Sequence, residues 1–175
     1  INEIHYNPLG PAARGDLEFV EIHNLGGLTV DLGGWWFGEG ITYAFPKGTT
    51  IGPREYLVLS RDPEGARSAY GLQRVEGPYE GRLDNDGEIV SLLDPAGHMV
   101  SRVHYGDSGE WPSLPDGFGP SLEFTGEDTG NDLHSRWAAS LAIGGTPGKR
   151  NSTYAPPESL SGAAGTDLLS ATSTF

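Results

Sequence analysis

The sequence predicts an all-β fold in which about eight or nine short strands form an antiparallel sandwich or barrel. Turn-forming residues are abundant, with 27 glycines and 13 prolines among 175 residues. Such a composition favours many short strands over long helices. Apolar and polar residues alternate in several short segments, whereas no window keeps a helical apolar repeat. The only helix expected is a turn or two at Pro63–Tyr70.

The first half of the chain contains several alternating segments. INEIHY, at the start, places Ile4 and Tyr6 on one face of a strand. LEFVEIHN places Phe19 and Glu21 together on one face of the next strand. WWFGEGITYAFP contains two short strands separated by Gly-Glu-Gly, and a further strand is expected at Glu55–Ser60.

The clearest hairpin lies in LDNDGEIVSLLDPAGHMVSRVHYG. Asp94–Gly97 reads Asp-Pro-Ala-Gly, which fits a type I turn with Asp first, Pro second and Gly fourth. The flanking strands alternate, with Val90 before the turn and Val103 after it. A short strand at Ser121–Phe124 follows, and a polar loop then leads to Trp137.

The charge balance excludes several classes of partner. The formal net charge is −13, from 24 acidic and 11 basic residues. An acidic surface repels phosphate backbones and anionic membranes, so no nucleic-acid partner is expected. There are no cysteines, which excludes disulfides, thiolate catalysis and Cys-based zinc sites. No apolar stretch is long enough to suggest insertion into a membrane.

Two acidic loops are candidate calcium sites, because Ca²⁺ takes about six to eight oxygen ligands. Neither loop has the spacing of an EF-hand, and Asp, Asn and Gly also form turns without a metal. We expect no required cofactor and regard Ca²⁺ as the candidate ligand, with the GEDTGND loop ahead of LDNDGE. The side chains offered by the first loop are Glu127, Asp128, Asn131 and Asp132, and those offered by the second are Asp84, Asn85, Asp86 and Glu88.

No arrangement of residues predicts catalysis. His5 and His23 could lie on adjacent strands, with Glu3 or Glu21 as a third metal ligand, but solvated or cross-strand histidines explain them more simply. HYGDSGEWP is similar to the segment around a protease serine. The cysteine framework of such proteases and a GxSxG nucleophile motif are both missing. We therefore expect that the protein is not an enzyme.

Several longer segments together resemble the lamin tail domain in its bacterial form. They are LEFVEIHNLGGLTVDLGGWWF, YAFPKGTTIGPREYLVLSRD and LDNDGEIVSLLDPAGHMVSRVHY, followed by SLEFTGEDTGNDLHSRWAASLAIGGTPGKRN. Each motif alone is weak, whereas their order and spacing are fairly specific. The resemblance extends over residues 1–151.

The resemblance implies an immunoglobulin-like β-sandwich and an extracellular or cell-surface location. It also implies no catalytic activity of the domain itself. Four signature residues are expected in the core, and Gly34 and Gly87 are expected at positive φ. The four expected core residues are Phe19, Trp35, Phe45 and Leu57.

The residues after 151 differ in composition from the rest. Residues 152–166 are rich in Ser, Thr, Pro, Gly and Ala and predict an extended linker. Asn151-Ser152-Thr153 is an N-glycosylation sequon, which makes Asn151 a candidate glycan site and glycans candidate partners.

Residues 167–175, DLLSATSTF, have the alternation of a strand. An isolated strand is unstable in water, so this segment needs a sheet edge to pair with. That edge could belong to a second copy, to the same domain or to a crystal neighbour. The segment's residues for self-association are Leu168, Leu169, Ala171, Ser173 and Phe175.

From these observations we expect an extracellular structural protein. Its partners would be copies of itself, joined head to tail through the C-terminal strand into a surface assembly or filament. The alternative is a non-catalytic binding or adhesion module of a larger secreted or cell-surface protein.

Overall fold

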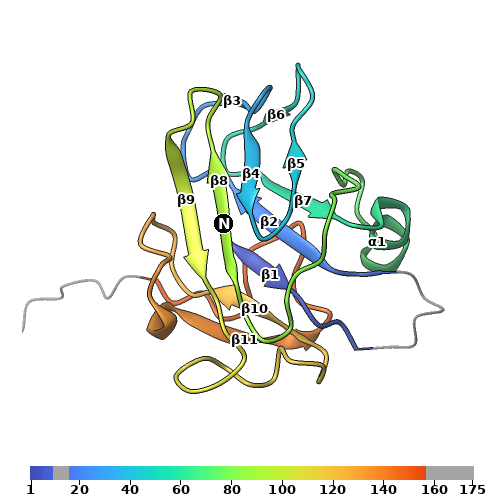
Figure 1. The fold of residues 1–175 in the computed structure, drawn as a ribbon, viewed down its shortest axis with the longest axis vertical. Helices are drawn as coiled ribbons and strands as arrows, with labels where there is room; N and C mark the ends of the chain where they lie inside the picture. Colours follow the sequence, from blue (N-terminus) through green and yellow to red (C-terminus); the bar gives the residue numbers. More distant parts are fainter. Residues whose placement is uncertain (10–15, 157–175) are drawn as a thin grey trace, which may run out of the picture.

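A computed structural model describes residues 1–9 and 16–156 and shows two antiparallel sheets packed face to face (Figure 1). Sheet A has the order β11-β10-β1-β2-β7 and sheet B has the order β5-β4-β8-β9. The strands of sheet B run nearly vertically across those of sheet A in Figure 1. The strands of sheet A are β1 (Glu3–His5), β2 (Phe19–His23), β7 (Tyr56–Ser60), β10 (Pro120–Phe124) and β11 (Trp137–Ile143).

Sheet B and a two-stranded ribbon complete the sandwich. The strands of sheet B are β4 (Trp36–Glu39), β5 (Tyr43–Ala44), β8 (Ile89–Leu93) and β9 (Met99–His104). The ribbon pairs β3 (Val30–Asp31) with β6 (Thr50–Ile51). Two short helices are α1 (Pro63–Tyr70) and a 3-10 turn, η2 (His134–Arg136).

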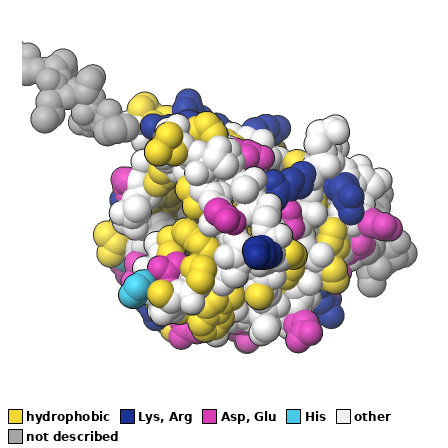
Figure 2. Space-filling view, turned by 90° about the horizontal axis from the view of Figure 1, so that it is seen from above, with side chains coloured by type: hydrophobic (Ala, Val, Ile, Leu, Met, Phe, Trp, Pro, Cys, Tyr) yellow, Lys and Arg dark blue, Asp and Glu magenta, His cyan; other side chains and the backbone are white. Residues whose placement is uncertain are grey.

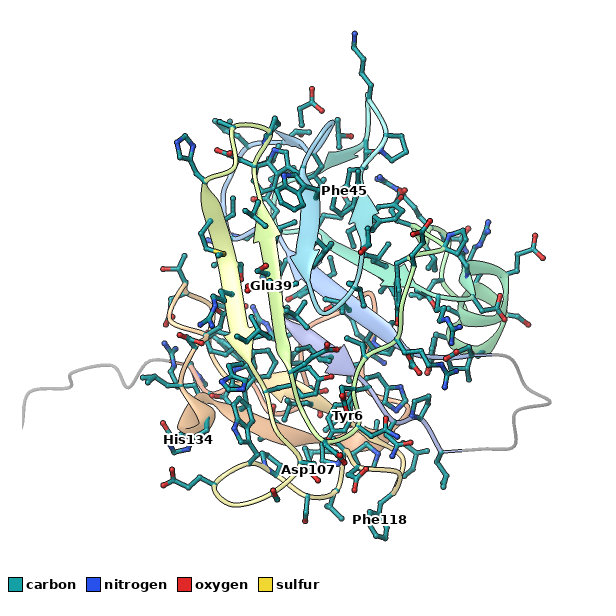
Figure 3. The ribbon with its side chains drawn as sticks, in the orientation of Figure 1. Tyr6, Glu39, Phe45, Asp107, Phe118 and His134 are labelled. Carbon is teal, nitrogen blue, oxygen red and sulfur yellow. The ribbon has the colours of Figure 1, made fainter. Side chains whose placement is uncertain are left out.

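The main hydrophobic core lies between the two sheets. Ile4 of β1 and Tyr6, which directly follows β1, are both fully buried in this core, as their alternation predicts. The Tyr6 ring stacks on the Tyr105 ring with centroids 5.0 Å apart, and Figure 3 shows Tyr6 inside the molecule. Phe45 and Leu57 belong to the same core, which confirms that part of the prediction.

Two of the expected core residues lie elsewhere. Phe19 is fully buried, but it lies on the outer face of sheet A, where its ring contacts Tyr70 of α1. Trp35 is only half-buried at the margin of the core. Phe37, two residues later, is the neighbouring aromatic that enters the core, because it faces inward from β4.

The turn and the helix that local sequence patterns predict are both present in the structure. Gly97 N donates to the carbonyl of Asp94 at 2.9 Å and closes the expected turn between β8 and β9. The helix at Pro63–Tyr70 is present, with Asp62 accepting from Gly65 N at its start and Gly71 at φ 68° at its end. The described residues form eleven strands, more than expected, because β3, β5 and β6 have only two residues each.

Gly87 shows why a glycine is needed just before β8. Its φ is +105°, and a Cβ built there would lie 2.5 Å from the carbonyl oxygen of Tyr105. Both the backbone angle and the close approach therefore exclude a side chain. Gly34 also has a positive φ, of +82°, as expected.

Candidate functional site

The most unusual feature of the fold is a row of three glutamates buried on the outer face of sheet A. Glu3 of β1 is paired with Glu21 of β2 and with Glu123 of β10, so the three side chains lie side by side. All three are fully buried. We call Glu3, Glu21 and Glu123 the carboxylate layer.

Residues 144–155 cross the outer face of sheet A and cover the carboxylate layer, and we call them the covering segment. Thr146 N donates to Glu3 Oε1 at 2.8 Å, and Gly148 N donates to Glu21 Oε2 at 2.5 Å. These backbone donors come from the Gly-Thr-Pro-Gly sequence at residues 145–148. Burial of a carboxyl group is tolerable only when such donors replace water.

Glu123 accepts hydrogen bonds from three residues of the covering segment. The hydroxyl of Thr146 donates at 2.6 Å and that of Ser152 at 2.8 Å. Thr153 donates through both its backbone N and its hydroxyl, each at 2.9 Å. The small polar side chains of the covering segment therefore supply the hydrogen bonds that these buried carboxylates need.

Burial raises the pKa values of two members of the layer. Desolvation raises the pKa of Glu3 to about 8, although hydrogen bonds from Ser121 and Thr146 oppose the shift. Desolvation, followed by the charge of Glu3, raises the pKa of Glu21 well above its ordinary value. Both shifts favour the protonated forms of these carboxyls, and a neutral carboxyl lowers the cost of placing three acids together.

The layer has no access to solvent, so it is not arranged to act on a substrate. Its oxygens face donors of the protein itself, and Asn2 Nδ2 occupies the remaining Glu21 oxygen at 2.8 Å. Across residues 1–9 and 16–156, no group of three or more His, Cys, Asp or Glu side chains is arranged to hold a metal ion. The layer fastens the covering segment to the sheet.

The four side chains of the first candidate calcium loop point to different partners. Glu127 pairs with Arg150 at 2.9 Å, and Asp128 pairs with Arg136 at 2.5 Å. Asp132 lies 3.5 Å from Arg102. The buried amide of Asn131 donates to the carbonyl of Ile1 and to the hydroxyl of Ser101. The structure does not bring these four groups together, and calcium binding by this loop stays a prediction.

The second acidic loop uses its oxygens to form a turn. Asp84 Oδ1 accepts from Asp86 N, and Glu88 Oε1 accepts from Asp84 N, each at 2.9 Å. The hydroxyl of Tyr105 also donates to Glu88 Oε1, at 3.2 Å. This is the role that Asp and Asn have in many turns without a metal.

His5 and His23 lie on the same face of adjacent strands but near opposite ends of them. His5 is paired with Phe19, whereas His23 is paired with Tyr56 of β7. The His23 ring stacks on the Tyr56 ring with centroids 4.1 Å apart. The carboxylate layer lies between the two histidines, so they do not form a two-histidine site.

Asn151 is buried within the fold. Its Nδ2 donates to the carbonyl of Asn2 at 2.9 Å and to that of Phe124 at 2.8 Å. An attached glycan would replace one of these hydrogens and would need space that this buried position lacks. In the folded domain Asn151 therefore anchors the covering segment, and its sequon is inaccessible.

The predicted self-association residues of the C-terminal segment lie outside the described residues. The structure does describe the strand edges to which such a segment could pair. The outer strands are β11 and β7 in sheet A and β5 and β9 in sheet B, and of these β11 and β9 have exposed apolar side chains.

Two antiparallel sheets packed over one apolar core define an immunoglobulin-like β-sandwich, a class that includes binding and structural modules. The model of the Lamin Tail Domain family matches residues 1–107 of the chain. The chain therefore belongs to the lamin tail domain family, which is not known for catalysis. No curated protein matches the chain.

The sandwich itself continues beyond the matched residues. β10 and β11 follow residue 107 and form one side of sheet A, and the covering segment follows β11. None of the helices in the described residues is both long and apolar enough to span a membrane.

Proposed function

We propose that the protein is an extracellular structural subunit that assembles with copies of itself by strand addition. In this proposal, residues 167–175 of one copy pair with an open sheet edge of the next copy. Contacts of this head-to-tail kind build rings or filaments. The resemblance to the bacterial form of the family supports an extracellular location.

The observation that supports strand addition is the open edge of sheet B at β9. β9 pairs with β8 on one side, and no backbone hydrogen bond joins it to any other described segment. Met99 and Val100 at its start are 52% and 42% exposed. An edge that combines unpaired backbone groups with exposed apolar side chains favours pairing with another strand.

The outer face of sheet B next to this edge is also apolar. Trp36 of β4 and Met99 of β9 are both exposed and flank Leu93 of β8 across three neighbouring strands. Figure 2 shows hydrophobic side chains gathered on the side of the molecule that bears a cyan histidine. A strand added at β9 would extend this face.

The other edges are less open. The backbone of Glu76 bonds to Val58 and Ser60 of β7, and that of Glu80 bonds to Thr42 beside β5. On β11, the hydroxyl of Ser152 accepts from Leu141 N at 2.8 Å. The pairing of β11 with β10 is irregular, as is that of β9 with β8, so the two edges differ in their hydrogen bonds and not in the regularity of their pairing.

The test compares the full chain with a chain that ends after Pro156. The structure sets this position, because Ser152 and Thr153 bind Glu123 and a shorter chain would uncover the carboxylate layer. Light scattering and negative-stain microscopy should show assemblies of the full chain and folded monomers of the shortened chain. Equal assembly of both chains would refute the proposal.

A pair of edge variants identifies the receiving strand. Met99→Lys places a charge at the β9 edge and should abolish assembly. Leu141→Lys is the matched control on β11, where the side chain is 82% exposed, and it should assemble normally. Loss of assembly in the control alone would move the receiving edge to β11. A calcium chelator added to each sample tests the candidate ion at the same time.

A second candidate function is a binding or adhesion module of a larger secreted or surface protein. One observation favours it, a cleft of about 540 Å³ on the outer side of sheet A. We call this the arginine cleft, and its lining residues are His23, Arg54, Tyr56, Glu127 and Arg150.

A further inference from the structure

The arginine cleft concentrates positive charge on a strongly acidic protein. The chain has 24 acidic and 11 basic residues, yet Arg54 and Arg150 both line this one cleft. Each guanidinium side chain is 62% exposed. The cleft therefore offers charged donors to an anion from solvent.

Arg54 is held in an unfavourable backbone conformation. Its φ of +58° is the only positive value at a non-glycine residue in the part of the chain that the structure describes. Arg54 is the third residue of a turn in which Glu55 N donates to the carbonyl of Gly52. Glycine would fit this third position without strain. An unfavourable backbone conformation at a residue with a large charged side chain suggests that this side chain has a functional role.

The guanidinium of Arg54 has spare donors. Its nearest carboxylate is that of Glu127, at 3.9 Å, and no hydrogen bond of Arg54 occurs within the described residues. Five N–H donors on this side chain can therefore still bind a ligand.

Arg150 is held more firmly. Its guanidinium lies over the Tyr154 ring, 4.6 Å from the centroid, and pairs with Glu127 at 2.9 Å. Glu127 thus lies between the two arginines and shows that a carboxylate fits there. Its loose contact with Arg54 leaves room for a second carboxylate to compete.

Two stacked rings form the aromatic part of the lining. The His23 and Tyr56 rings are nearly parallel, with an angle of 16° between them. His23 Nε2 is buried and has no hydrogen-bond partner within residues 1–9 and 16–156. The site therefore combines aromatic ring surface with two cationic donors.

We propose that the arginine cleft binds the carboxylate of an acidic saccharide, a hexuronate chain. The guanidinium groups would hold the carboxylate, and the Tyr56 and His23 rings would contact the sugar ring. An acidic peptide is less suited, because the only strand edge beside the cleft is the start of β7 at Tyr56: β2 is central in sheet A, and Glu76 covers β7 at Val58 and Ser60. Glu127 would act as an internal competitor.

The test measures binding of three probes to the full chain by calorimetry and NMR titration. The probes are an oligogalacturonate, a neutral oligosaccharide of equal length and an oligoglutamate. We expect the oligogalacturonate to bind, with an affinity that falls with salt, and the other two to bind at least tenfold more weakly. Failure of the oligogalacturonate to bind at millimolar concentration would overturn the proposal, and preference for the oligoglutamate would replace the saccharide with a peptide.

Four variants test whether the oligogalacturonate binds in the arginine cleft. Arg54→Gly should keep the fold, because glycine suits the turn, and should weaken oligogalacturonate binding about tenfold, as should Arg150→Gln. Arg67→Gln is the matched control, since Arg67 is exposed on α1 away from the cleft, and its affinity should not change. Glu127→Gln should tighten binding about fivefold by removing the competitor.

Equal binding by all four variants would place the ligand elsewhere and refute the assignment. This inference bears on the second candidate function and does not depend on strand addition at β9. Either one can fail in its own experiment without affecting the other.

Discussion

The two faces of sheet A are both buried, but for different physical reasons. The inner face excludes water with apolar side chains such as Ile4 and Leu122. The outer face excludes water with hydrogen-bonded carboxyls, beginning with Glu3, under the covering segment. Burial alone therefore does not distinguish an apolar core from a polar layer.

The two faces respond differently to a change of pH. Apolar burial does not depend on the protonation of any group. The pKa values of Glu3 and Glu21 are raised in the folded protein, so the contribution of the carboxylate layer to folding depends on pH. The stability that the inner face contributes is therefore independent of pH, whereas the stability that the outer face contributes depends on pH.

The largest expected effect comes from a cavity in the apolar face. Leu122→Ala should lower the free energy of unfolding by about 3 kcal/mol, because Leu122 is fully buried between the sheets. Urea denaturation should give the same loss at pH 6 and at pH 9. A loss that differs strongly between the two pH values would show that the two faces are not independent.

The next effect, compared per unit of pH, concerns the titration of the carboxylate layer. The folded-state pKa of Glu3, about 8, lies above its ordinary value, so the folded protein keeps a proton that the unfolded chain has lost. The resulting stabilisation is complete below about pH 4.5 and is lost as the pH rises towards 8, by at most about 1.4 kcal/mol per pH unit.

Glu3→Gln removes this titration and should flatten the dependence of stability on pH between 5 and 8. Urea midpoints measured across this range provide the check. Glu64→Gln on the exposed face of α1 controls for the change in net charge. An unchanged slope in Glu3→Gln would mean that Glu3 is already ionised in the folded protein.

A smaller effect should follow from removing one donor of the cover. Thr146→Val deletes the hydroxyl that donates to Glu123 at 2.6 Å and should cost about 1.5 kcal/mol. Hydrogen exchange should speed up in the covering segment and stay unchanged in β8. Thr129→Val, on an exposed loop, is the control, and equal effects of the two variants would contradict a special role for Thr146.

The smallest effect has the opposite sign. Arg54→Gly relieves a positive φ and should stabilise the folded protein by about 0.5 kcal/mol, after allowing for the greater freedom of glycine when unfolded. Thermal unfolding measures this gain. A clear loss of stability would show that the Arg54 side chain stabilises the fold and is not kept free for a ligand.

Local patterns were enough to predict the inner face of the sandwich. The alternation around Ile4 and Val90 identified side chains that point inward, and Asp94–Gly97 contained the turn that it forms. These features depend on neighbours within a few residues, so a single sequence can reveal them.

The outer face could not be predicted in the same way. Alternation put Phe19 and Glu21 on one face, but a glutamate in a strand usually faces water. Its burial depends on Gly148, 127 residues later, which donates to it. The segment GTPGKRN formed part of the resemblance, but its local sequence does not indicate where its backbone N–H groups point.

The covering segment also determines how a mechanical load would reach the domain. Any pull on the residues after Pro156 first meets the bond from Ala155 N to the carbonyl of Thr125, and then the bonds from Thr153 and Ser152 to Glu123. These bonds would break one after another, as in peeling, before the strands of sheet A separate. Force spectroscopy would record this step as an early extension of about 40 Å, the contour length of the segment.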